Sequence, residues 1–195
     1  MIFKKVLLFV SVLMAMAFTN RDSAIKNTSV VLTNESSIMV RGTTNVNSFN
    51  CGYKINKFKN PIPVTYYLEG DKIRFNKTVL ILDNICFDCG GKGINSDFQK
   101  ILKSDKYPQI FLFLKEISQI ENSSDVHASI DIQMAGLTKN YKVPVEVKNN
   151  NNLLITGDMA LKLSDFNLET PKKLFGLISV NDKIEIFFQL AVKEN

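Results

Sequence analysis

The clearest pattern of the sequence lies in residues 126–147, VHASIDIQMAGLTKNYKVPVEV. From Val126 to Met134 every even position is apolar, and the odd positions carry histidine, serine, aspartate and glutamine. Alternation with a period of two predicts a half-buried antiparallel strand. After Gly136 the chain turns, and the apolar alternation returns at Tyr141, Val143, Val145 and Val147. The stretch therefore predicts two adjacent strands that each bury one face.

Similar patterns recur on both sides of this pair. The further predicted strands cover residues 36–46, 63–69, 72–82, 110–120, 153–163 and 184–190. Turn residues separate them, among them four asparagines at residues 149–152, which tolerate left-handed backbone. About eight strands with turns between them indicate an all-β antiparallel domain, built as a sandwich or as a barrel.

One segment interrupts the strands. Ser96 begins a capping-box spacing, and Phe98, Ile101 and Leu102 form one apolar helical face. The sequence therefore predicts one short helix near residues 97–104, packed over the mouth or the side of the strands.

Residues 1–18 are typical of a secretory signal peptide. Two lysines precede an apolar run at residues 6–18, which is shorter than the roughly 20 residues needed to span a bilayer. An Ala-Met-Ala triplet at residues 15–17 has the pattern of a cleavage site; an uncleaved membrane anchor is the alternative. We expect a periplasmic or secreted protein in which residues 19–35 form a lead-in and the start of the first strand, and residues 36–195 form one domain.

Neither charge nor motifs indicate a nucleic-acid partner or an enzyme. The formal net charge is +5, but basic residues are scattered among acidic ones, whereas nucleic-acid binders cluster them. The sequence contains no G-x-S-x-G, no phosphate-binding glycine loop and no H-E-x-x-H. An enzymatic function would require His127, the single histidine, to lie near a cysteine inside the fold. We therefore expect a non-enzymatic protein that uses no cofactor and no metal.

Three cysteines, Cys51, Cys86 and Cys89, allow at most one internal disulfide and leave one thiol. Cys86 and Cys89 form a C-x-x-C, but no βαβ pattern of a thioredoxin-like redox site surrounds it. The cysteines and His127 could supply four zinc ligands, although their spacing fits no compact zinc motif. We favour a structural disulfide, and the spacing alone does not decide which two cysteines pair.

Four segments, taken in order along the chain, resemble motifs of the YceI-like family. They are RGTTNVNSF at residues 41–49, LKSDKYP at residues 102–108, MAGLTK at residues 134–139 and LSDF at residues 163–166. The family's versions read G-T-S-x-V-x-S-F, L-K-S-x-x-Y-P, G-x-T-[KR] and a segment that usually continues with F-G. Asn167 stands where that glycine is common. The resemblance extends from residue 36 to residue 193.

This resemblance implies an eight-stranded antiparallel, lipocalin-like β-barrel with one short helix inserted near residues 97–104. It also implies an elongated pocket for a polyisoprenoid or quinone-type lipid, held by diffuse apolar contacts without catalytic residues. Inward alternation combined with that shape gives ten candidate pocket residues: Phe49, Phe98, Phe111, Phe113, Ile132, Met134, Met159, Phe166, Phe175 and Phe188.

The positions of Cys51 and Cys89 resemble those in a subgroup of the family, which has a cysteine after the first strand and an F-D-C segment before the helix. Our hypothesis is a structural bond between these two residues. In the chain-entropy account, such a bond closes a loop of about 40 residues and stabilises the fold by roughly 3–4 kcal/mol.

Two hypotheses of different classes follow. The protein is an exported carrier of a long apolar molecule, or it is a secreted structural or interaction barrel whose interior is filled by its own side chains. An eight-stranded barrel is wide enough inside for either arrangement. The sequence leaves dimerisation and transient membrane contact open.

Overall fold

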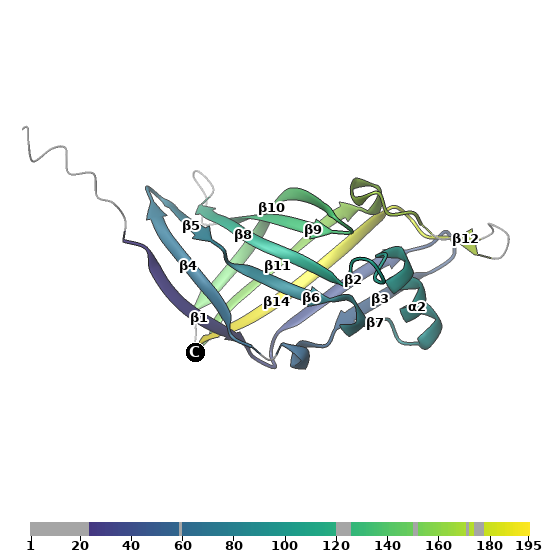
Figure 1. The fold of residues 1–195 in the computed structure, drawn as a ribbon, viewed down its shortest axis with the longest axis horizontal. Helices are drawn as coiled ribbons and strands as arrows, with labels where there is room; N and C mark the ends of the chain where they lie inside the picture. Colours follow the sequence, from purple (N-terminus) through teal and green to yellow (C-terminus); the bar gives the residue numbers. More distant parts are fainter. Residues whose placement is uncertain (1–23, 59, 120–125, 150–151, 171, 174–177) are drawn as a thin grey trace, which may run out of the picture.

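The computed structural model describes residues 24–58, 60–119, 126–149, 152–170, 172–173 and 178–195. Eight of the described strands form a closed antiparallel ring, in which the last strand returns to the first (Figure 1). The ring confirms the predicted all-β, eight-stranded architecture. Its members, in ring order, are β1 (Lys26–Leu32), β4 (Ile62–Glu69), β5 (Lys72–Asn76), β8 (Gln109–Gln119), β9 (Val126–Met134), β10 (Leu137–Asn149), β11 (Leu153–Lys162) and β14 (Lys183–Glu194).

Shorter strands extend two members of the ring. From β14 the pairing continues through β2 and β3 to β7, while β6 pairs with β8. These strands, with a separate two-stranded hairpin, are β2 (Ser37–Thr43), β3 (Ser48–Tyr53), β6 (Val79–Asp83), β7 (Phe87–Asp88), β12 (Lys172–Lys173) and β13 (Ile178–Ser179). The helical elements of the described residues are α2 (Lys92–Ile101) and the 3-10 turns η1 (Ile55–Lys57), η2 (Asn84–Cys86) and η3 (Leu163–Phe166).

The first strand of the ring differs from the one expected. The alternating segment at residues 36–46 corresponds to β2, and the ring begins with β1, whose sequence KNTSVVL does not alternate. Both strands pair with β14, β2 with its first half and β1 with its end. The predicted strand at residues 72–82 is likewise divided into β5 and β6, because Lys77 between them has a left-handed φ of +58°.

The helix begins one turn earlier than expected. α2 covers Lys92–Ile101 rather than residues 97–104, and its N-cap is Gly91 rather than Ser96. Ile94 lies four residues before Phe98, so the apolar face of the helix starts there. The Asn95 side chain accepts a hydrogen bond from the Cys89 backbone N–H at 2.6 Å, which ties this first turn to the segment before it.

Glycine allows an aromatic ring to lie across a strand inside the ring. Gly157 of β11 stands opposite Phe188 of β14. A Cβ atom at Gly157 would lie 2.6 Å from the Phe188 ring and 2.9 Å from the carbonyl oxygen of Pro144. The phenylalanine can turn aside, but the backbone oxygen is fixed by the sheet.

Replacing Gly157 with alanine should therefore lower the free energy of unfolding by about 1–3 kcal/mol through overpacking. The matched control is Gly52→Ala in β3, where nothing lies within 4 Å of the added methyl group. Urea unfolding of the two variants measures the difference. Equal unfolding midpoints would show that β10 and β11 are not packed as described.

Candidate functional site

The strand ring encloses a cavity of about 360 Å³. Alternate residues of β14 line it from one end of the ring to the other: Ile184, Ile186, Phe188, Leu190 and Val192. Eight residue steps at about 3.3 Å each make this lined length about 26 Å. The cavity is therefore long and narrow and follows the strands.

The wall is apolar. Among the 36 described residues that line the cavity, Thr78 is the only one with a polar side chain. Its hydroxyl oxygen accepts a hydrogen bond from the backbone N–H of Thr65 at 3.3 Å. Because an ionised group in such surroundings loses its hydration without gaining a partner, the cavity favours uncharged, apolar contents.

Among the described residues, the lining is buried at one end of the cavity, here called the sealed end, and more exposed at the other, the open end. At the end of the ring covered by α2, the lining residues Leu102, Met134 and Leu163 are each 4% exposed. At the opposite end of the ring, the lining residue Leu153 at the start of β11 is 38% exposed, and Val64 of β4 is half-buried. A molecule would therefore enter beside β4 and the start of β11.

Side chains of α2 and of the turn that follows it close the sealed end. Phe98 and Ile101 face the cavity from the helix. Beyond the helix, the Lys103 ammonium donates to the carbonyl oxygen of Asn167 at 2.9 Å. The Tyr107 ring lies against Gly136, where a Cβ atom would come within 2.9 Å of it. Segments far apart in the chain are thereby joined over one end of the ring.

The turn η3 completes this seal. Asp182 accepts hydrogen bonds from the Ser164 backbone N–H at 2.7 Å and from its hydroxyl at 2.6 Å. These two bonds hold the pKa of Asp182 below its usual value. The turn ends at Asn167, whose φ of +52° is left-handed, which explains why glycine is common there and why asparagine is tolerated.

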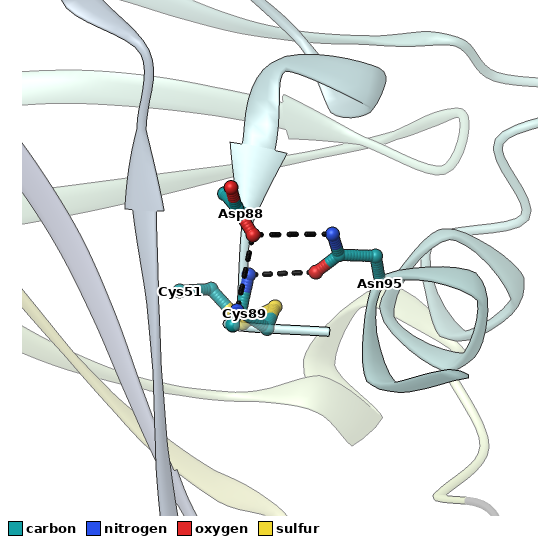
Figure 2. The surroundings of a disulfide bond; sticks show 5 residues. Cys51, Asp88, Cys89 and Asn95 are labelled. Atoms are coloured by element: carbon teal, nitrogen blue, oxygen red, sulfur yellow. Dashed lines mark hydrogen bonds between the residues drawn. A yellow bond between two sulfur atoms is a disulfide. The ribbon is translucent and has the colours of Figure 1, made fainter. Parts of the chain in front are cut away.

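A disulfide links Cys51 of β3 to Cys89, the pairing that we hypothesised (Figure 2). Asp88 beside it accepts hydrogen bonds from the Gly90 backbone N–H and from the Asn95 side chain, and forms an ion pair with Lys54 at 3.4 Å. The Gly90 N–H is the main reason that the pKa of Asp88 is lowered. The disulfide therefore fixes the segment that leads into α2 to the sheet.

The third cysteine is buried at the same end. Cys86 is a free thiol and is 8% exposed. Near it, burial raises the pKa of Tyr53 to about 12, and the Tyr53 hydroxyl accepts a hydrogen bond from the Asp83 backbone N–H. His127 lies on β9, whose Ala128, Ile130 and Ile132 face the cavity, and so points to the opposite side of the strand.

Six of the ten candidate pocket residues line the cavity. They are Phe49, Phe98, Ile132, Met134, Met159 and Phe188. Phe175 lies outside the described residues.

Phe111 and Phe113 were placed on the wrong face. The cavity is lined from β8 by Ile110, Leu112 and Leu114, so the two phenylalanines point outward, with ring centroids 6.1 Å apart. All five residues are apolar, and a strand without alternation gives no sign of which face is inside.

Phe166 is fully buried but does not line the cavity. It sits in η3, where its ring stacks on Tyr141 at a centroid distance of 6.4 Å. Its role is to pack the sealed end.

Several lining residues were missed. Val30 and Leu32 of β1 belong to a strand that the pattern did not reveal, and Ile62 and Val64 of β4 lie beside prolines. The inner face of β8 could have been found from β9, because Leu112 pairs with Ile132 of the regular stripe. That inference needs the strand register, which the sequence does not provide.

The YceI-like domain family matches residues 29–192, most of the chain. The chain belongs to the YceI-like family. The comparison with curated proteins finds no match. No helix in the described part of this YceI-like chain has the length and apolar character that crossing a membrane requires. The described residues also contain no group of three or more histidine, cysteine, aspartate or glutamate side chains that could hold a metal ion.

Solved structures with the same fold come from several bacteria. BcnA of Burkholderia cenocepacia is 18% identical with a TM-score of 0.55, over 82% of this chain and 96% of that one. A polyisoprenoid binding domain from Saccharophagus degradans, implicated in plant cell wall breakdown, is 10% identical with a TM-score of 0.58, over 89% of this chain and 100% of that one. The YceI protein of Campylobacter jejuni is 16% identical with a TM-score of 0.50, over 68% and 80%. At these identities the likeness shows the fold.

Replacing Asp182 with asparagine should remove an acid-dependent part of the stability. Because the folded pKa of Asp182 is lowered, its contribution is complete above the unfolded value, about pH 4, and is lost as the pH falls through the lower folded value. We therefore expect Asp182→Asn to lower the Tm near neutral pH, and the gap to wild type to shrink below about pH 4.

Thermal unfolding from neutral to acidic pH measures this gap. Ser164→Ala removes one of the two donors to Asp182 and should produce a smaller change of the same sign. A gap that stays constant across the pH range would contradict the assignment.

Proposed function

We propose that this YceI-like protein is an exported, non-enzymatic carrier that holds a long apolar molecule, a polyisoprenoid or a similar lipid, inside its strand ring. The observation that carries the proposal is the elongated cavity with an almost wholly apolar wall. Its volume of about 360 Å³ falls within the range of about 300–1,000 Å³ that is usual for small-molecule sites.

Burial of an apolar chain supplies the binding energy. Each buried methylene group contributes up to about 0.8 kcal/mol. A tail of ten carbons would then contribute a gross amount of about 8 kcal/mol, from which the cost of immobilising the ligand is subtracted. No directed polar contact is needed for such binding.

The comparisons support the class of ligand. The Saccharophagus degradans domain, which shares this fold over its whole length, is described as binding polyisoprenoids. The cavity of this chain has the elongated shape and apolar lining that such a molecule requires. A ring packed solid with its own side chains, the alternative hypothesis, would leave no such volume.

Three further features support an exported carrier that does not act chemically on what it binds. The described lining contains no carboxylate, imidazole, amine or thiol that could act on a bound molecule. The disulfide between Cys51 and Cys89 is of a kind that persists in oxidising compartments such as the periplasm. The apolar run at residues 6–18, outside the described residues, supplies the export signal in this proposal.

The test is native mass spectrometry of the purified protein, followed by organic extraction. We expect a stoichiometric adduct that extracts as a prenyl or acyl lipid, or uptake of an added polyprenyl lipid. A measured mass equal to that of the protein alone, with no uptake of added lipid, would contradict the proposal.

A matched pair of variants on β11 assigns the uptake to the cavity. Ile155 lines the cavity, and Thr156 faces the other side of the strand. Ile155→Trp should reduce lipid uptake at least tenfold by filling the cavity, and Thr156→Trp should bind as wild type does. Equal uptake by both variants would place the lipid elsewhere.

A further inference from the structure

Thr78 is the one polar interruption of the cavity wall within the described chain. It is 7% exposed and immediately precedes β6, whose Leu80 and Leu82 also line the cavity. Valine has the same shape without the hydroxyl and would continue the apolar lining of the cavity. The hydroxyl therefore needs a reason.

The neighbouring backbone accounts for the hydroxyl oxygen of Thr78. The pairing of β4 with β5 ends at Thr65 and Asn76, because Lys77 turns the chain with a φ of +58°. The Thr65 N–H is left beside this break and donates to the hydroxyl oxygen of Thr78. The oxygen thus serves as an acceptor for the wall.

The hydroxyl proton of Thr78, in contrast, is not used by the wall. Among the described residues, none accepts a hydrogen bond from Thr78, although a buried donor without an acceptor is unfavourable. The group can rotate about its Cβ–Oγ bond and present this proton to the interior. An occupant of the cavity is the acceptor that this position can reach.

The depth of Thr78 is defined by its neighbour on β8. The Leu114 N–H donates to the Thr78 carbonyl oxygen at 3.0 Å, and Leu114 is the central residue of Gln109–Gln119. Thr78 therefore lies about halfway along the ring. An ionised head group at that depth would be stripped of water with only one donor to compensate.

We infer that Thr78 is a specificity-determining residue, which donates its hydroxyl proton to an uncharged oxygen acceptor held halfway along the cavity. Among the apolar lipids of the proposed class, the ligand is then one that carries an uncharged carbonyl, ester or ether oxygen, and not one whose carboxylate or phosphate head is buried. This inference rests on the proposed carrier function and adds to it the chemistry of the ligand.

The test compares two probes that differ by a single oxygen, heptadecan-9-one and heptadecane. Dissociation constants of both are measured for wild type, Thr78→Val and Thr78→Ser by competition with a fluorescent apolar probe. We expect Thr78→Val to weaken binding of the ketone about tenfold and to leave binding of the alkane unchanged. Thr78→Ser should retain the preference for the ketone.

A control variant and a second readout separate this role from a structural one. Thr156→Val removes a hydroxyl on the face of β11 that points away from the cavity and should leave both affinities unchanged. In wild type, the carbonyl infrared band of the bound ketone should lie below its position in alkane solvent, as hydrogen bonding requires. This readout applies even where Thr78→Val does not fold.

The outcomes distinguish the two proposals. If wild type takes up neither compound, the carrier function and this inference fail together. If wild type binds both, but the ratio of affinities is the same in Thr78→Val, or the carbonyl band lies where it does in alkane solvent, the role of Thr78 alone is overturned.

Discussion

The backbone pairing of β14 on both its edges holds the structure together. On one edge it pairs with β11 from Leu153 to Lys162, and on the other it pairs with β2 and then with β1. Without the last of these pairings the sheet would be open, and its apolar inner face would meet water. Closure turns that face into the wall of a cavity, and it also pairs the edges of β1 and β14, which would favour aggregation if they were exposed. The sealed end, the open end and the depth of Thr78 are all defined relative to this ring.

Much of the fold could be predicted because several strands have only one buried face. The alternation in β9 and β14 identifies both the strands and their inner residues, and Ile132, Met134 and Phe188 do line the cavity. The method fails where both faces are apolar, as in β8, since Phe111 and Leu112 look equally suited to the interior. It fails also for β1, which has no regular pattern and is held in place by its long-range partners.

The sealed end shows why the remaining details depend on three-dimensional contacts. Phe166 has the composition of a pocket residue, but η3 turns it away from the cavity and onto Tyr141. Three of the segments that resemble family motifs meet there through Tyr107, Gly136 and Asn167. Those segments therefore pack one end of the cavity, while the wall that would face a ligand is made almost wholly of apolar residues. The sequence pattern does not reveal Thr78, because a threonine between two strands has no special meaning until its neighbours are known.

The hydrogen bond from the Thr28 hydroxyl to Glu194 joins residues 166 positions apart, next to the pairing of β1 with β14. A chain synthesised from its N-terminus can pair β1 with β4 early, but it gains β14, the second partner of β1, only after every other strand of the ring has been made. Until then, the apolar inner faces of the earlier strands stay exposed and can associate with other chains. Long-range closure of this kind is also slow, because the entropy of joining the two ends is spent before any contact is gained. The cell that produces this protein has to keep it from aggregating for the whole interval between the first strand and the last.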